Sequence, residues 1–307
     1  MNRHCRAIIL PFIVILASCG NGERVPTCDW YVNAAMGNNN NAGTPGAPFK
    51  TITYALTRTK SGEVVCAAPG TYNAVSGETF PIVVPANVAL RSLEGRAGTA
   101  VEGGGTYSLA FGTVKLGFYA SDQSTIDGFT IKVPSADVVG IDVGIATESG
   151  AAEIKNNAFV GIAMGHVGGA AIATGGSAAP LIADNTMTGC HDGIGSFGAS
   201  APVIRRNIMT LNEDQAVDAQ ENAVPDLGTP ADPGRNTIKD NGSRGLFNET
   251  ADSIIQAAGN TWNVNCTTDA SGHYTTQLIK GAYDNATACP GELSNFRIEN
   301  EGASIQL

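Results

Sequence analysis

The feature that most constrains the fold is a short motif that recurs five times in the second half of the chain. Each copy places an asparagine two positions before an apolar residue, as in EIKNNAFVG and LIADNTMTG. The five asparagines, separated by 22 to 29 residues, are Asn157, Asn185, Asn207, Asn236 and Asn260. Repeats of this length, with short strands and no helix, fit single coils of a parallel β-helix that stack at about 4.8 Å. We therefore expect the asparagines to form a structural hydrogen-bonded ladder.

A second recurring pattern, a small residue followed by an apolar one, marks a further strand in each coil. The five pairs are Gly140-Ile141, Ala171-Ile172, Gly193-Ile194, Ala216-Val217 and Gly245-Leu246. Glycine is abundant, aromatic residues are few, and long helical patterns are absent. The sequence thus predicts an all-β chain, a single-stranded right-handed parallel β-helix over residues 28–262.

Both ends of such a solenoid need covers, because open strand edges and apolar end faces promote association with other chains. Thr51–Lys60 is the one plausible short helix, and we expect it to cap the N-terminal end. His273–Leu278 and Phe296–Ile298 have the pattern of short strands. We therefore expect residues 263–307 to form a C-terminal β cap.

The N-terminal strand candidates form a characteristic series: Tyr31–Ala35, Ala47–Ile52, Val64–Tyr72, Gly77–Ile82 and Val88–Leu90. This series closely resembles the N-terminal domain of a bacterial family of unknown function within the pectate-lyase-like β-helix superfamily. The resemblance covers most of the chain and implies the parallel β-helix fold. It implies no activity, because that family has no established one to carry over.

The first residues read as an export signal. Arg3 and Arg6 give a positive start, and the apolar run from Ala7 to Leu16 is too short to span a bilayer, which takes roughly 20 residues. The following string, Leu16-Ala17-Ser18-Cys19, resembles the bacterial lipobox, which is cleaved just before its cysteine. This resemblance implies a signal peptide at 1–18, lipidation of Cys19 and a tether at 19–27. Gly20, where the resembled inner-membrane retention signal has Asp, favours the outer membrane.

Charge limits the partners of the exported chain. Without Arg3 and Arg6 it has 16 basic and 28 acidic residues, a net charge of −12. No basic cluster remains, so we expect no nucleic-acid partner. We expect a monomer that reaches the membrane through its lipid anchor.

Five cysteines remain beyond the anchor, and an oxidising compartment favours their pairing. We expect Cys28–Cys66 near the start and Cys266–Cys289 near the end, with Cys190 left over, although spacing alone does not fix the connectivity. No Cys or His pair has the spacing of a metal site, so no metal site is predicted.

Candidate chemistry lies on the outer face of the strands that carry the small-apolar pairs. Aligning the coils on Ile141, Ile172, Ile194 and Val217 puts Asp142 and Asp218 in one outward column, three coils and about 14 Å apart. That separation is too large for a glycosidase pair, which needs about 5–9.5 Å. The small residues between the two acids, Ala173 and Gly195, could still floor a shallow groove, with Asp142, Asp192 and Asp218 as candidate binding residues.

The turn entering this strand holds the one predicted catalytic pair. His191 aligns with Asp214 in the next coil, about one strand spacing away, so His191 is a candidate general base. The string around His191 resembles a polygalacturonase motif, but the Asp-Asp pair and the Arg-x-Lys of that motif are missing. A solvated turn residue is the competing interpretation.

Two further charged groups allow weaker interpretations. Asp214, Asp218 and Glu221 could form a Ca²⁺ patch, although no D-x-D-x-D-G loop occurs. Lys155 and Arg205 align in another strand, where charges are usually solvated or paired across strands.

Three functional hypotheses remain. The first is a lipid-anchored envelope protein that binds glycans or envelope partners without catalysis. The second is a polysaccharide-modifying enzyme (lyase, hydrolase or epimerase) acting on an extended acidic glycan. The third is a purely structural envelope component.

Overall fold

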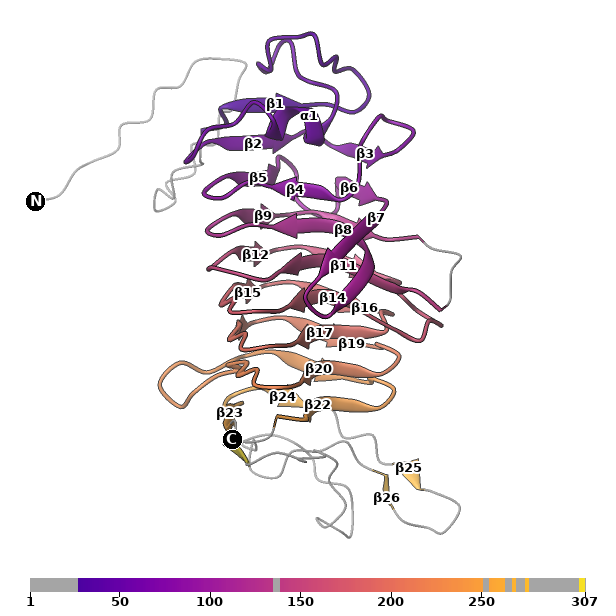
Figure 1. Cartoon of the computed structure of the whole chain (residues 1–307), viewed down its shortest axis with the longest axis vertical. Coiled ribbons are helices and arrows are strands. Elements are labelled where there is room, and N and C mark those ends of the chain that lie inside the picture. The colour runs from indigo at the N-terminus through magenta and orange to yellow at the C-terminus, as the bar shows by residue number, and fades with distance from the viewer. Residues whose placement is uncertain are drawn as a thin grey trace, which may run out of the picture.

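The computed structural model describes residues 27–134, 139–250 and 254–262, and the backbone of residues 267–268, 274–275 and 304–306. The described chain winds into a right-handed parallel β-helix whose coils stack along one axis (Figure 1). Each complete coil from β2 to β20 contributes one strand to each of three parallel sheets, so strands distant in sequence lie side by side. The predicted fold class is confirmed.

Sheets 1 and 2 form two walls of the solenoid. Sheet 1 comprises β1 (Trp30–Val32), β2 (Val64–Ala67), β5 (Ala89–Ser92), β9 (Thr125–Asp127), β12 (Glu153–Lys155), β15 (Leu181–Ala183) and β18 (Val203–Arg205). Sheet 2 comprises β3 (Gly70–Asn73), β6 (Thr99–Glu102), β10 (Thr130–Lys132), β13 (Ala158–Val160), β16 (Thr186–Thr188), β19 (Ile208–Thr210), β21 (Thr237–Lys239) and β24 (Thr261–Trp262).

Sheet 3 forms the remaining wall and carries the candidate site. Its parallel strands are β4 (Ile82–Val84), β8 (Gly112–Ala120), β11 (Ile141–Thr147), β14 (Gly168–Thr174), β17 (Asp192–Ser196), β20 (Gln215–Ala219) and β22 (Arg244–Asn248). One further strand, β7 (Gly105–Leu109), pairs antiparallel with β8. The two form a hairpin that the sequence did not predict.

The core is a set of apolar stacks, because equivalent inward positions of successive coils lie in register. In sheet 2 the stack consists of the apolar residues that follow the asparagines: Phe159, Met187, Met209, Ile238 and Trp262. In sheet 3 it consists of Phe118, Ile145, Ile172, Ile194, Val217 and Leu246. Burying these faces against neighbouring coils stabilises the solenoid.

The five asparagines form a continuous ladder at the turn between sheets 1 and 2. The amide of Asn157 donates to Oδ1 of Asn185 at 3.2 Å, and that of Asn185 donates to Oδ1 of Asn207 at 3.0 Å. The series continues through Asn236 to Asn260. Each amide also donates to a backbone carbonyl, so the buried polar groups of the turn are satisfied.

One register expectation was wrong. Sheet 3 pairs Ile145 with Ile172, whereas Ile141 pairs with Gly168 and is partly exposed. The inward pair in this coil is therefore Gly144-Ile145, four residues after the predicted Gly140-Ile141. β11 has seven residues and contains two isoleucines that each follow a glycine, so the sequence pattern alone did not distinguish them.

The N-terminal helix is shorter than predicted. Instead of Thr51–Lys60, α1 covers Ile52–Leu56 and buries its apolar face on the first coils. The Glu78 carboxylate accepts hydrogen bonds from the first helical amides, which fixes its start. Beyond the helix, the hydroxyls of Thr57 and Thr59 donate to backbone carbonyls three residues earlier, a local bonding that competes with further helix.

The C-terminal strands are β23 (Ile254–Gln256), β25 (Thr267–Thr268), β26 (Tyr274–Thr275) and β27 (Ser304–Gln306). β23 pairs in parallel with β27, and β25 pairs antiparallel with β26. The predicted strand Phe296–Ile298 lies outside the described residues, as do Cys19, Cys266 and Cys289. Among the described residues, no helix has the length and apolarity that crossing a membrane demands.

Candidate functional site

The β7–β8 hairpin divides the outer face of sheet 3 into a covered and an uncovered part. The hairpin folds over β8, β11 and β14, where its side chains form a second apolar cluster with outward residues of these strands (Figure 1). Its tip ends at Phe111, whose ring stacks on Phe197 with centroids 4.7 Å apart. The hairpin therefore does not cover the outer face of β17, β20 and β22, although Asp218 and Phe247 on that face are only 6% and 8% exposed.

The strands β17, β20 and β22 carry polar and aromatic side chains on their outer face, around the small residue Gly195. The strand pairing aligns Ala173, Gly195, Asp218 and Phe247 in one column. The Phe197 ring covers Gly195 in this column, since a Cβ there would lie 2.9 Å from that ring. On the hairpin side of the column lies the Phe111–Phe197 stack, and on the other side Arg244 lies 4.0 Å above the Phe247 ring.

Asp218 is the most buried acid of this face. Only 6% of its surface is exposed, and its Oδ2 accepts a hydrogen bond from Gln220 at 2.7 Å. Its Oδ1 is buried and accepts no hydrogen bond from the part of the chain that the structure describes. The pKa of Asp218 is raised to about 7, first by burial and then by the charge of Asp192, against the opposing effect of the Gln220 hydrogen bond.

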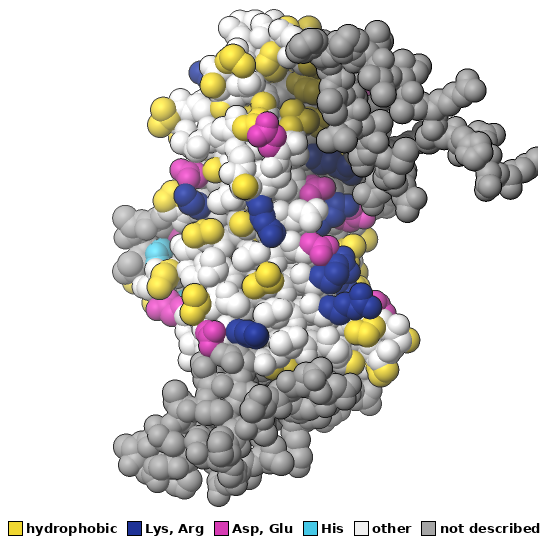
Figure 2. All heavy atoms as spheres, turned by 180° about the vertical axis from the view of Figure 1, so that it is seen from behind, with side chains coloured by type: hydrophobic (Ala, Val, Ile, Leu, Met, Phe, Trp, Pro, Cys, Tyr) yellow, Lys and Arg dark blue, Asp and Glu magenta, His cyan; other side chains and the backbone are white. Residues whose placement is uncertain are grey.

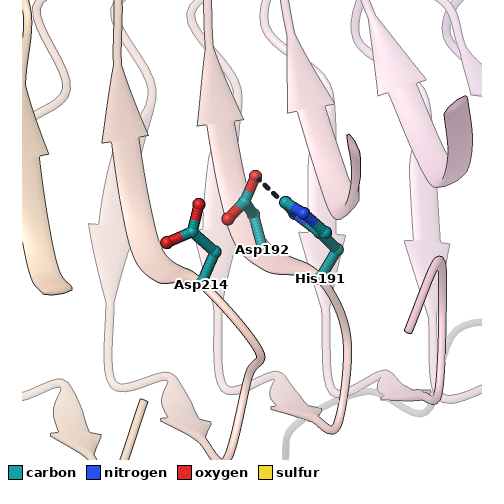
Figure 3. A group of neighbouring side chains, drawn as sticks. All are labelled: His191, Asp192 and Asp214. Atoms are coloured by element: carbon teal, nitrogen blue, oxygen red, sulfur yellow. Dashed lines mark ion pairs between the residues drawn. The ribbon is translucent and has the colours of Figure 1, made fainter. Parts of the chain in front are cut away.

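His191, Asp192 and Asp214 meet at the turn that enters β17 and β20. Figure 3 shows Asp192 between the other two, with all three side chains projecting to the same side of the sheet. One ligand atom from each lies within 4.8 Å of the others. The turn is held by backbone bonds, because His191 N donates to Ile162 O and Asp214 N donates to His191 O.

The closest partner of His191 is Asp192, not Asp214 as the alignment suggested. His191 Nδ1 lies 3.3 Å from Asp192 Oδ2. The other carboxylate oxygen, Asp192 Oδ1, accepts a hydrogen bond from the backbone amide of Gln215 at 2.9 Å. The Asp192 carboxylate raises the pKa of His191; burial lowers it, and the charges of Asp214 and Glu213 raise it. The cluster thus combines an imidazole with two carboxylates, a donor set suited to proton transfer or to a metal ion.

Asp142 does not share a column with Asp218, because the register of its coil is shifted by four residues. Asp142 pairs with Lys115 and Gly169, and only 1% of its surface is exposed. Its Oδ2 lies 3.7 Å from Nδ1 of His166, whose side chain is also buried. The expected groove floor of Asp142 and Asp218 is therefore wrong, and Asp142 belongs to a second His–Asp pair that the sequence did not reveal.

The Ca²⁺ patch expected from Asp214, Asp218 and Glu221 is also wrong. Asp214 precedes the five-residue strand β20 and Glu221 follows it, so the two lie roughly 16 Å or more apart. Glu221 instead accepts a hydrogen bond from the amide of Gly198. These acids cannot coordinate one ion.

The charged residues of sheets 1 and 2 form ion pairs. From behind, basic side chains gather near one edge of the solenoid with acidic ones beside them (Figure 2). Lys155, Ala183 and Arg205 do align in sheet 1, as expected. Lys155 pairs with Glu153 at 2.6 Å, and the buried Arg205 pairs with Asp226 and Asp232 of the loop after β20. These ion pairs hold strands and loops together. Because both signs of charge are mixed, they do not form a uniformly basic or acidic binding surface.

Other residues singled out from the sequence have structural roles. Cys28 and Cys66 form a disulfide that joins the chain start to β2. Cys190 is a free, fully buried thiol, and burial raises its pKa to about 12. A second, shorter ladder was missed: Asn212 donates to Asn241 at 2.9 Å and accepts the amide of Cys190. Its signal was the 29-residue spacing between Asn212 and Asn241, the same as from Asn207 to Asn236.

Comparison with solved structures shows the same fold. The crystal structure of pectate lyase Pel9A superposes with a TM-score of 0.51 at 16% identity, covering 78% of this chain and 65% of that one. This chain thus spans just under two thirds of that lyase. Pectin methylesterase PemA from Erwinia chrysanthemi gives a TM-score of 0.40 at 14% identity, covering 81% of this chain and 84% of that one. At 16% identity, the likeness to the pectate lyase shows the fold alone.

Comparison at the sequence level gives the family. Among curated proteins, none matches the chain significantly. Residues 35–269, most of the described solenoid, match the family described as proteins of unknown function, DUF1565. This stretch includes every strand of sheet 3 and all residues of the uncovered face. The chain therefore belongs to the DUF1565 family and carries its pectate-lyase-like parallel β-helix.

Proposed function

We propose that this protein binds a carbohydrate chain on the outer face of β17, β20 and β22, at the cell envelope. The observation that carries the proposal is the composition of this face. Carboxylates and amides lie between two aromatic elements, Phe247 and the Phe111–Phe197 stack, whose Phe197 ring covers Gly195. Ligand sites typically combine apolar surface with a few convergent polar groups.

The chemistry of these groups matches that of a sugar. Carboxylates such as Asp218 accept hydrogen bonds, and amides such as Gln220 both donate and accept them, as sugar hydroxyls also do. The apolar faces of aromatic rings can cover the C–H face of a sugar ring. Gly195 lets the Phe197 ring lie directly over the backbone of β17, since a Cβ there would be only 2.9 Å from that ring.

The sign of the charge favours a neutral glycan. Asp192, Asp214, Asp218 and Glu249 all lie on or beside this face, and the chain is acidic overall. A polyanionic polysaccharide would be repelled unless cations screened or bridged it. We therefore propose a neutral glycan, in place of the acidic one considered from the sequence.

Binding to a glycan array tests this proposal, with the purified full chain as the probe. Asp218→Asn and Phe247→Ala should each weaken binding to the glycans that the native protein retains. Glu153→Gln, on the exposed part of sheet 1, is the matched control and should bind as the native protein does. Equal binding by all three variants, or no binding to any neutral glycan, would refute the proposal.

Catalysis is the second candidate, and the His191 cluster favours it. Asp192 orients the imidazole, and Asp214 lies within reach of it, an arrangement suited to a general base. Turnover of polysaccharides that is lost in both His191→Ala and Asp214→Asn would establish an enzyme. Retention of glycans without turnover would establish the binding protein.

The envelope location rests on the lipobox-like string that ends at Cys19. We propose that Cys19 carries the lipids and that the tether at 19–27 leads to the solenoid. Radiolabelled fatty acid should label the native chain and not Cys19→Ser, and the variant should leave the membrane fraction. Continued labelling of Cys19→Ser would remove the anchor from the proposal and leave the glycan face unaffected.

A further inference from the structure

We propose that His191, Asp192 and Asp214 bind one divalent metal ion of the zinc class. The proposal does not depend on glycan binding, because it concerns the turn beside the glycan face. Their ligand atoms, an imidazole nitrogen and two carboxylate oxygens, come within 4.8 Å of one another from two successive coils (Figure 3).

The distances suit a small metal ion. Ligands about 2.0–2.2 Å from a tetrahedral zinc ion lie about 3.3–3.6 Å from one another. His191 Nδ1 and Asp192 Oδ2 are already 3.3 Å apart. Asp214 would need to move its carboxylate by about 1 Å or slightly more. No described residue donates a hydrogen bond to that carboxylate, so the side chain is free to make this adjustment.

His191 Nδ1 supplies an independent observation. Its accessible surface is below 1 Å², yet it makes no hydrogen bond with any residue that the structure describes. Its one polar contact in the described chain is the 3.3 Å ion pair with Asp192, which lacks hydrogen-bond geometry, and native proteins rarely leave a buried ring nitrogen without a hydrogen bond. Its nearest polar atom, Asp192 Oδ2, lies in the direction where a shared ligand would sit. A metal ion between these two atoms would satisfy both.

The electrostatics also require a cation. Asp192 and Asp214 lie close together, and neither forms an ion pair with an Arg or Lys among the described residues. A divalent ion would neutralise this charge, whereas protonation of His191 alone would offset only part of it.

The surrounding backbone holds two of the ligands in place. Asp192 Oδ1 accepts the amide of Gln215, which orients Oδ2 toward the imidazole. Such outer bonds to a ligating carboxylate are typical of metal sites. The buried thiol of Cys190 points into the core and takes no part, although it precedes His191 in sequence.

The donor set predicts which ion binds. Ca²⁺ prefers six to eight oxygen ligands and Mg²⁺ keeps most of its water, so neither suits a site with an imidazole. Zn²⁺ and Co²⁺ accept one nitrogen and two carboxylate oxygens. Three protein ligands leave a fourth position for water or a ligand hydroxyl, as in zinc sites that exchange ligands.

Calorimetric titration of the chelator-treated full chain with Zn²⁺, without any glycan, tests the proposal. We expect about one ion per chain, tighter binding than for Ca²⁺, and a rise in the unfolding temperature. His191→Ala and Asp214→Asn should each lower the Zn²⁺ affinity at least as much as loss of an outer partner, about 10–100-fold. The Co²⁺-loaded native chain should show visible d–d absorption that both variants lose.

Two controls separate this site from other zinc-binding groups. Cys190→Ala removes the adjacent thiol, and His166→Gln removes the histidine of the neighbouring turn; both should keep the native affinity. Circular dichroism establishes that every variant is folded, and Asp214→Asn keeps the shape of the side chain. Unchanged Zn²⁺ affinity in both ligand variants, loss of binding in Cys190→Ala, or tighter Ca²⁺ than Zn²⁺ binding would overturn the proposal.

Discussion

A single asparagine of the ladder shows how polar side chains can stabilise a buried turn. Asn207 is fully buried; its amide donates to Ile182 O and to Asn236 Oδ1, and its Oδ1 accepts from Asn185. Asparagine alone combines this acceptor and these donors in so short a side chain. Each coil repeats the arrangement, which explains why the residue type recurs while its neighbours vary.

Replacing one ladder residue should therefore cost more than replacing an exposed one. Asn207→Ala leaves several buried donors and acceptors without partners, each worth about 1–3 kcal/mol. We expect the free energy of unfolding to fall by about 3–5 kcal/mol, measured by urea unfolding. Asn222→Ala, in an exposed loop, should change it by less than about 0.5 kcal/mol. Similar effects for the two variants would contradict a structural role for the ladder.

Asp218 should make stability depend on pH. The folded chain raises its pKa from 3.8 to about 7, so folding is opposed increasingly as the pH rises through this range. Asp218→Asn is neutral and avoids this cost. The variant should match the native protein near pH 4 and exceed its free energy of unfolding by up to about 4 kcal/mol near pH 8. A difference that stays constant with pH would contradict the raised pKa.

At the scale of the elements, the sequence predicted the spacing of the coils better than it predicted which residues lie on their outer faces. The asparagines mark one position per coil and give the register of sheet 2 correctly, because nothing else in the turn has that hydrogen-bonding capacity. In sheet 3 the small-apolar pair occurs twice in β11, and only packing against Phe118 and Ile172 selects Ile145. That one ambiguity displaced Asp142 by four residues and produced the wrong groove.

The candidate site was predicted only in part for the same reason. His191 and Asp214 were brought together correctly because their coils lie in register with Ile194 and Val217. The His166–Asp142 contact depends on the conformation of a long turn, which has no periodic pattern. The β7–β8 hairpin interrupts a coil, so the repeat could not indicate that it folds over the sheet.

The Cys28–Cys66 disulfide is the element that should protect the N-terminal end. It closes a loop of 38 residues, for which chain entropy predicts about 4 kcal/mol of stabilisation. In the Cys28→Ala/Cys66→Ala variant we expect amide exchange to accelerate in β1, β2 and α1, and to stay unchanged in sheet 3 from β14 onward. Uniform acceleration along the chain would show that the ends unfold together with the centre.

The whole molecule is nearly one-dimensional, since each coil contacts mainly its neighbours. Its stability should then be a sum over coils and their interfaces. Local damage should remain local, and the number of coils should be adjustable wherever the register is kept. Leu181 and Val203 occupy equivalent positions in successive coils.

Removing residues 181–202 should therefore leave a folded, shorter solenoid. The deletion joins Pro180 to Val203, stacks Asn157 on Asn207 and takes out one 22-residue coil. We expect a native-like far-ultraviolet dichroism spectrum and cooperative unfolding at a lower temperature. Deleting only 181–191 removes half a coil, breaks the register of sheet 3 and should abolish folding. Equal behaviour of the two deletions would contradict the coil as the unit of stability.

The hairpin over β8, β11 and β14 makes the two ends of the outer face of sheet 3 different, because it closes one of them. A polymer lying along the solenoid axis would reach a blind end at the Phe111–Phe197 stack. From there the described strands β17, β20 and β22 offer a track of about 10 Å. A polymer in that orientation has to begin at the stack, so the protein would recognise the terminus of a chain or a side branch. The hairpin, an insertion in one coil, would thus restrict this face to binding the ends of polymer chains and prevent it from binding their interiors.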